Sequence, residues 1–145
     1  MNITFRNEGR KLSESDLSIV ESHFNFKFPD QYKNFLLEHN GGIPGNVYYL
    51  VNDNGYVINF FLSLFVKELS FEEYFQDYKI NTKVLPDRMV PIAEDAFGNA
   101  ICISVSGEDY GAIFFWDHED SDTEMRQIAI SFNDFLNGLV EDIPE

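Results

Sequence analysis

From residue 89 onward, the chain is a succession of short apolar segments, rich in β-branched and aromatic residues and separated by turn residues. Residues 89–93, 100–105, 112–116 and 127–130 have the length and composition of strands. Two more strands are expected at residues 47–51 and 56–61, joined through the hairpin sequence Asn52-Asp53-Asn54-Gly55. Strands joined by tight turns pair antiparallel, so the pattern predicts a mainly antiparallel sheet of about five to six strands.

About four helices are expected to flank this sheet, which gives an α+β fold. Ser13 and Ser70 each open a helix with a capping box or a close variant of it. Pro29 suits the first position of a helix that Asn40-Gly41-Gly42 ends. Ser131 opens the last helix, whose apolar stripe is predicted to contain Phe132, Phe135, Leu136 and Leu139.

The length of 145 residues indicates a single domain over residues 1–145. A single cysteine, Cys102, forms no internal disulfide and suits a reducing compartment. The N-terminal segment lacks the apolar region of a signal peptide, and the most apolar stretch, residues 57–66, is too short to span a bilayer. We therefore expect a soluble, cytoplasmic protein, with a monomer favoured.

Acidic residues dominate the end of the chain. The formal net charge is -15, and residues 101–145 hold eleven acidic side chains against one cation, Arg126. We expect these carboxylates to form one acidic face. A field of this sign repels phosphate backbones and anionic lipid headgroups, which argues against direct binding of nucleic acids or membranes.

The candidate catalytic groups have simpler structural roles. His39 lies on an apolar helical stripe, His118 is surrounded by carboxylates that favour its charged form, and nothing marks His23 as catalytic. Cys102 lies in a strand with no cation near it in sequence, which favours a small core residue over a nucleophile.

The carboxylate pairs and the acidic loop do not form a convincing catalytic or metal site. Glu94-Asp95 and Glu108-Asp109 are adjacent pairs, whose side chains point to opposite faces of a strand or into water in a turn. In the acidic loop 117–124, Asp120, Asp122 and Glu124 occupy alternate positions as in a calcium-binding loop. Counted from Asp120, however, Met125 replaces the required glycine at the sixth position and Ser131 the bidentate glutamate at the twelfth. We expect no metal and no cofactor.

Three segments resemble the signature of the SUKH superfamily, and they occur in the expected order. Residues 28–42 contain Phe-Pro, a tyrosine, a Phe-Leu pair and a terminal Asn-Gly-Gly. Residues 91–103 resemble the central hairpin of the family, with a Gly-Asn turn. Residues 114–119, Phe-Phe-Trp-Asp-His-Glu, resemble its aromatic strand end. The resemblance covers roughly residues 13–140.

The resemblance implies an α+β domain that binds other proteins and has no catalytic residues. Many bacterial members are immunity proteins that neutralise toxins, often nucleases, whereas fungal relatives regulate cell-wall glucan synthesis. The motif residues have structural explanations, such as helix entry, core packing, helix exit, a tight turn and an aromatic anchor. They are Pro29, Tyr32, Asn40, Gly41, Gly42, Gly98 and Trp116.

The sequence thus favours an immunity protein whose carboxylates dock against a basic toxin domain, with a nuclease as one target class. The proposed partner-binding residues are Glu108, Asp109, Tyr110, Asp117, Glu119, Asp120, Asp122 and Glu124. A regulatory scaffold of the cell-wall type is the alternative. A hydrolase acting through Asp95 or Asp117 is less favoured, and a small-ligand cleft at Tyr48, Tyr49 and Phe65 is a further possibility.

Overall fold

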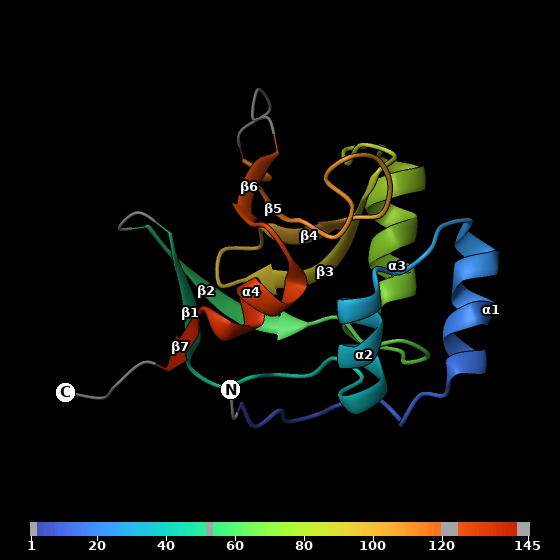
Figure 1. Ribbon diagram of the computed structural model, residues 1–145, viewed down its shortest axis with the longest axis horizontal. Helices are drawn as coiled ribbons and strands as arrows, with labels where there is room; N and C mark the ends of the chain where they lie inside the picture. Colours follow the sequence, from blue (N-terminus) through green and yellow to red (C-terminus); the bar gives the residue numbers. More distant parts are fainter. Residues whose placement is uncertain (1–2, 52–53, 120–124, 142–145) are drawn as a thin grey trace.

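The computed structural model describes residues 3–51, 54–119 and 125–141, which form a seven-stranded antiparallel sheet with four α-helices and one π-helical turn (Figure 1). The strands are β1 (Val47–Val51), β2 (Asn54–Phe61), β3 (Met89–Asp95), β4 (Ala100–Ser104), β5 (Ile113–Trp116), β6 (Arg126–Ala129) and β7 (Leu139–Glu141). The helices are α1 (Glu14–Phe24), α2 (Asp30–Glu38), α3 (Phe71–Phe75) and α4 (Phe132–Asn137), and η1 (Gln76–Asn81) continues α3. The α+β class is confirmed.

The sheet is a meander with one strand returned to its far edge. Its order is β6-β5-β4-β3-β2-β1-β7, so six strands follow the chain and α4 carries it from β6 back to β1 (Figure 1). Seven strands in the described residues correct the expected five to six. The additional strand contains Leu139, which was expected on the last helix but pairs with Tyr49 of β1. A helical repeat of apolar residues fits Leu139 equally well, and only the free edge of β1 favours the strand.

The helix starts follow the capping residues closely. The Ser13 hydroxyl accepts a hydrogen bond from the Asp16 amide at 3.2 Å, and the Asp16 carboxylate accepts one from the Ser13 amide at 2.9 Å. Ser70 caps α3 by accepting from the Glu73 amide at 3.3 Å. Pro29 is the residue before α2 and not its first helical residue, because its ψ of 143° is extended.

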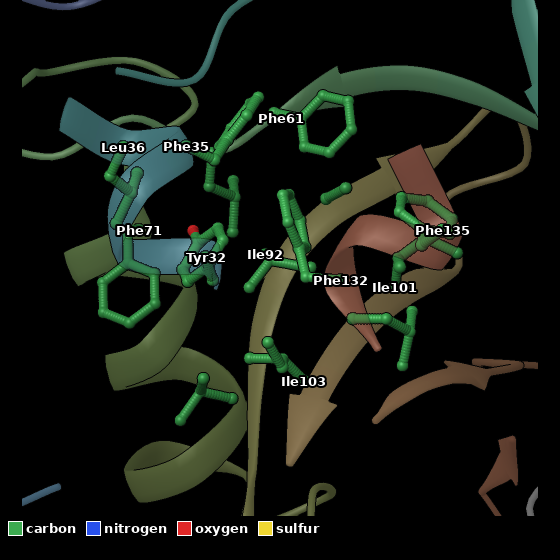
Figure 2. Close-up of a cluster of buried hydrophobic side chains, with 14 of the residues drawn as sticks. Tyr32, Phe35, Leu36, Phe61, Phe71, Ile92, Ile101, Ile103, Phe132 and Phe135 are labelled. Atoms are coloured by element: carbon green, nitrogen blue, oxygen red, sulfur yellow. The ribbon is translucent and has the colours of Figure 1, made fainter. Parts of the chain in front are cut away.

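The main core lies between the helices and one face of the sheet, which we call the inner face. Aromatic side chains from α2 and α4 meet there, and the rings of Tyr32 and Phe132 lie 5.1 Å apart. Figure 2 shows this cluster, which includes Tyr32, Phe35, Leu36, Phe61, Phe71, Ile92, Ile101, Ile103, Phe132 and Phe135. All of these residues are buried, so this part of the inner face forms the core.

A second, smaller cluster covers part of the opposite, outer face. Alternation along β4 places Ile101 in the main core and Cys102 in this second cluster. Tyr78 of η1 and Leu85 from the following segment pack over it, next to Phe114 of β5. The π-helical turn therefore serves to cover the outer face of β3, β4 and β5.

The sheet is curled, so that strands far apart in its order come together. The Arg126 guanidinium on β6 donates a hydrogen bond to the Tyr56 hydroxyl on β2 at 2.9 Å. The rings of Tyr56 and Phe115 are 4.5 Å apart in the same region. The only cation of the last third of the sequence is thus held against the inner face of β2 and β5.

Candidate partner-binding site

Three of the proposed contact residues lie in the loop between β4 and β5. Asp109 accepts a hydrogen bond from the Ser104 hydroxyl at 2.6 Å and is 3.2 Å from the Arg88 guanidinium. The Ser104 hydrogen bond, followed by Arg88, holds the pKa of Asp109 below its usual range. Tyr110 donates its hydroxyl proton to the Lys27 carbonyl at 3.0 Å, while Glu108 is exposed. Asp109 and Tyr110 thus also serve the fold.

Two more proposed contacts, Asp117 and Glu119, follow β5 directly. The Glu119 amide donates to the Asp117 carboxylate at 2.9 Å, which fixes the start of this connection. The Glu119 side chain is 81% exposed, so its charge faces solvent. Asp120, Asp122 and Glu124 lie outside the described residues.

The described carboxylates form two groups and not one continuous face. One group, in residues 108–110, precedes β5. The other, which consists of Asp117 and Glu119 and which we call the Asp117 group, follows β5, so the strand separates the two groups. Glu141, on β7, lies at the opposite edge of the sheet from β6. Proximity in sequence suggested a single face, but an antiparallel meander sends successive loops to opposite ends of the strands.

A hydrogen-bond network holds the Asp117 group in place. Buried Asp95 accepts from the amides of Phe97 at 2.9 Å and Asn99 at 2.8 Å. The Asn99 side chain donates to Asp95 at 3.1 Å, and its oxygen accepts from the His118 amide at 3.0 Å. His118 Nδ1 lies 2.6 Å from the same oxygen, to which it donates a hydrogen bond. The network joins the β3–β4 turn rigidly to the segment after β5.

The comparison with known families decides the identity of the fold. The model of the SMI1 / KNR4 family (SUKH-1) matches residues 11–138, which is most of the chain. The chain belongs to the SUKH-1 family. The resemblance drawn from the three motifs is therefore confirmed. This family includes toxin immunity proteins, and its domains are generally non-catalytic.

A segment of this SUKH-1 domain is also similar to a phage-derived protein. The SPbeta prophage-derived uncharacterized protein YokK of Bacillus subtilis (strain 168) is 44% identical to it over 59 residues. The match covers 39% of this chain and 29% of the Bacillus protein. The similarity is therefore limited to one segment of each protein and does not establish the activity of the whole chain.

The motif residues of the SUKH-1 domain serve its architecture. Tyr32 is 1% exposed in the main core, and the ring of Trp116 packs at 5.4 Å from Tyr78. Gly98 has φ +84°, and a side chain there would point at the His118 ring. These positions stabilise the fold and the turn.

Asn40 has the most demanding of these roles. Its amide group donates to the carbonyls of Arg10 at 3.0 Å and Leu64 at 2.9 Å, and its oxygen accepts from the Leu64 amide at 2.7 Å. Gly41 follows with φ +68° and lies against the Leu62 backbone, where a Cβ would clash. The segment after α2 therefore ties the N-terminal region to the segment after β2.

The groups that a hydrolase would need are engaged or buried. Glu94 accepts a hydrogen bond from the Tyr74 hydroxyl at 3.3 Å, and burial raises its pKa. Asp95 holds the β3–β4 turn, and Cys102 is fully buried, which raises the pKa of its thiol. In the described ranges, no group of three or more His, Cys, Asp or Glu residues could hold a metal ion.

Tyr48, Tyr49 and Phe65, considered above as the lining of a small-ligand cleft, do not come together. Tyr49 packs on Phe135 in the main core, Tyr48 points to the other side of β1, and Phe65 lies beneath the Arg10 guanidinium. A cavity of about 200 Å³ lies elsewhere, between α2, α4 and the N-terminal segment. Within the described part of the chain, no helix is long and apolar enough to cross a membrane.

The structure also reveals an apolar surface that was not predicted from the sequence. The side chains of Tyr48, Leu50, Val57 and Val140 lie on the outer face of β1, β2 and β7, and we call this set the outer strip. The signal was present in the sequence, because both faces of residues 47–51 are apolar. A fully apolar strand predicts burial on both sides, and only the structure shows which side stays bare.

Proposed function

We propose that this SUKH-1 domain is an immunity protein that binds and neutralises a cognate bacterial toxin without catalysing a reaction. The observation that carries the proposal is the acidic excess on a scaffold whose family includes such proteins. The formal charge is -15, and Arg126, the cation of the last third, is hydrogen-bonded to Tyr56.

Electrostatic complementarity supplies the mechanism. A nuclease toxin binds phosphate, so the cleft that holds its substrate is basic. Exposed carboxylates such as Glu119 and Glu108 can occupy the positions of phosphates in that cleft. Complementary charge also speeds association, which suits protection against an enzyme that acts inside the cell. We propose that the protein acts in the cytoplasm, where such a toxin would reach its target.

A survival assay tests the proposal directly. The protein encoded by the adjoining reading frame is expressed in a host cell, alone and together with this protein. We expect growth arrest with the toxin alone and restored growth when both are expressed. If co-expression leaves the arrest unchanged, and no other neighbouring product is neutralised, the immunity function is wrong.

Matched charge variants refine the assay. Glu119→Gln and Glu108→Gln each remove one charge from an exposed carboxylate, one from each of the two acidic groups. Loss of protection with only one of them identifies the acidic group that contacts the toxin. Recovery of a cell-wall-synthesis factor in place of a toxin would instead support the regulatory scaffold.

A further inference from the structure

We infer that the outer strip (Tyr48, Leu50, Val57 and Val140) is the docking surface for the partner. The inference rests on the proposed function and names the surface that performs it. The occupant is a protein whose contact surface is apolar at its centre and rimmed by Lys or Arg. The three strands that carry the strip lie side by side at one edge of the molecule, away from α1 (Figure 1).

The register of the strands makes the strip continuous. Tyr48 is paired with Val57 on one side and with Val140 on the other, so the three side chains form a row across β7, β1 and β2. Leu50 is two residues further along β1 on the same face, beside Gly55. Leu50 is 54% exposed, Val57 45% and Val140 39%.

The outer strip is exposed because the segments that cover the outer face pack only over one part of the sheet. Tyr78 and Leu85 pack over Cys102 and Phe114, on β4 and β5, and complete the second cluster there. The same face continues across β2, β1 and β7, where the side chains of the outer strip remain in contact with solvent. A contiguous apolar face on a sheet is a typical site for another protein to bind.

The strip is joined to the Asp117 group of carboxylates. The Ala96 amide donates to the Val57 carbonyl at 3.0 Å, which attaches the β3–β4 turn to the strip. Phe97, in that turn, is 77% exposed. The Asn99 side chain then links the turn to His118, between Asp117 and Glu119. An apolar surface and an acidic border are therefore held together before any partner binds, which lowers the entropic cost of binding.

Charge identifies the occupant. The described residues of β1, β2, β3, β7, the β3–β4 turn and residues 117–119 contain no Lys or Arg, whereas Glu94, Asp117 and Glu119 belong to these segments. A basic rim on the partner would match this border. A second copy of the chain would bring another formal charge of -15 and would be repelled.

Leu50→Lys tests the surface, with Ile19→Lys as the matched control. Both variants replace an exposed aliphatic side chain by lysine, at 54% exposure on β1 and 60% on α1. Binding to a catalytically inactivated form of the toxin is measured by calorimetry, and folding by circular dichroism. We expect Leu50→Lys to raise Kd by at least about tenfold and Ile19→Lys by less than about twofold. Val57→Lys provides the same readout from β2 should Leu50→Lys fail to fold.

Leu50→Glu separates the apolar from the electrostatic contribution. It removes the same aliphatic group but adds a charge that suits a basic rim, so we expect a smaller rise in Kd than with Leu50→Lys. If the wild type protects cells and the strip variants bind as tightly as Ile19→Lys, the docking surface is wrong and the immunity function stands. If the wild type neither binds nor protects, both proposals fall.

Discussion

Carboxylate side chains have different roles in this protein because their surroundings differ. Asp95 is buried and organises a turn, Asp109 is partly buried beside Ser104 and Arg88, and Glu119 is almost fully exposed. A carboxylate that accepts several hydrogen bonds stabilises the fold, whereas an exposed one is available to a partner. Exposure and partners, more than residue type, decide which acids can serve binding.

Asp109→Asn should destabilise the protein in a pH-dependent way. The pKa of Asp109 is lowered in the folded state, so its contribution is present above the unfolded pKa of about 3.9 and is lost as the pH falls through the folded-state pKa. We expect a loss of about 1 kcal/mol in the free energy of unfolding at neutral pH, shrinking below about pH 4. Urea unfolding at several pH values measures it.

Glu108→Gln is the control for this prediction, because Glu108 is exposed in the same loop. We expect its free energy of unfolding to stay close to that of the wild type. A difference between Asp109→Asn and the wild type that stays constant from neutral to acidic pH would contradict the assignment.

The thiol of Cys102 should be unreactive in the folded protein. It is 0% exposed, and burial raises its pKa, so very little reactive thiolate forms at neutral pH. We expect a thiol-specific reagent to label the native protein only as fast as the protein unfolds, and to label it rapidly in denaturant. Fast labelling of the native protein would show that β4 is accessible and would contradict the packing of the second cluster.

At the scale of elements, the segments between helices and strands are held as firmly as the elements themselves. The Asn40 side chain forms hydrogen bonds with backbone groups of two separate segments. The Asp95 carboxylate accepts hydrogen bonds from backbone amides of the β3–β4 turn in the same way. Both are buried polar groups that are fully engaged, an arrangement that specifies one conformation. The rigid ends of these elements position the exposed residues next to them.

Asn40→Ala should be strongly destabilising. It would leave the buried Leu64 amide and carbonyl without their partner, and the Arg10 carbonyl as well. We expect a loss of about 3 kcal/mol, measured by chemical unfolding, because unsatisfied buried groups carry the full cost of desolvation. Asn34→Ala, on the exposed face of α2, should be nearly neutral. Equal effects of the two variants would contradict this role for Asn40.

At the scale of the whole molecule, the curl of the sheet divides the surface into distinct regions. The helices pack over the inner face, and η1 covers the outer face of β3, β4 and β5. The outer face of β1, β2 and β7 stays bare, close to the Asp117 group of carboxylates. The net charge then acts as a long-range field around this surface.

Association with the toxin should depend strongly on salt. We expect the association rate constant to fall by about tenfold or more between about 0.05 M and about 0.5 M salt, with a smaller change in the dissociation rate constant. Stopped-flow fluorescence measures both. Glu119→Gln should lower the rate constant at low salt, because this carboxylate is 81% exposed. An association rate that ignores ionic strength would contradict electrostatic steering.

The sequence by itself determined the local structure and the family. The caps at Ser13 and Ser70, the antiparallel hairpins and the alternation of core residues along β4 follow from short-range preferences that neighbouring residues satisfy among themselves. The three motifs led to the SUKH family for the same reason, since each is a contiguous segment.

Only the tertiary structure decided the remaining features, because they depend on residues far apart in sequence. Leu139 fits a helix or a strand equally well, and the free edge of β1 made it a strand. The carboxylates of the last third form two groups because β5 runs between them. Asp109 forms its hydrogen bond with Arg88, a residue 21 positions away in the sequence. Which face of an apolar strand stays bare depends on what packs over it, and η1 reaches β4 and β5 but leaves Tyr48 and Val57 uncovered.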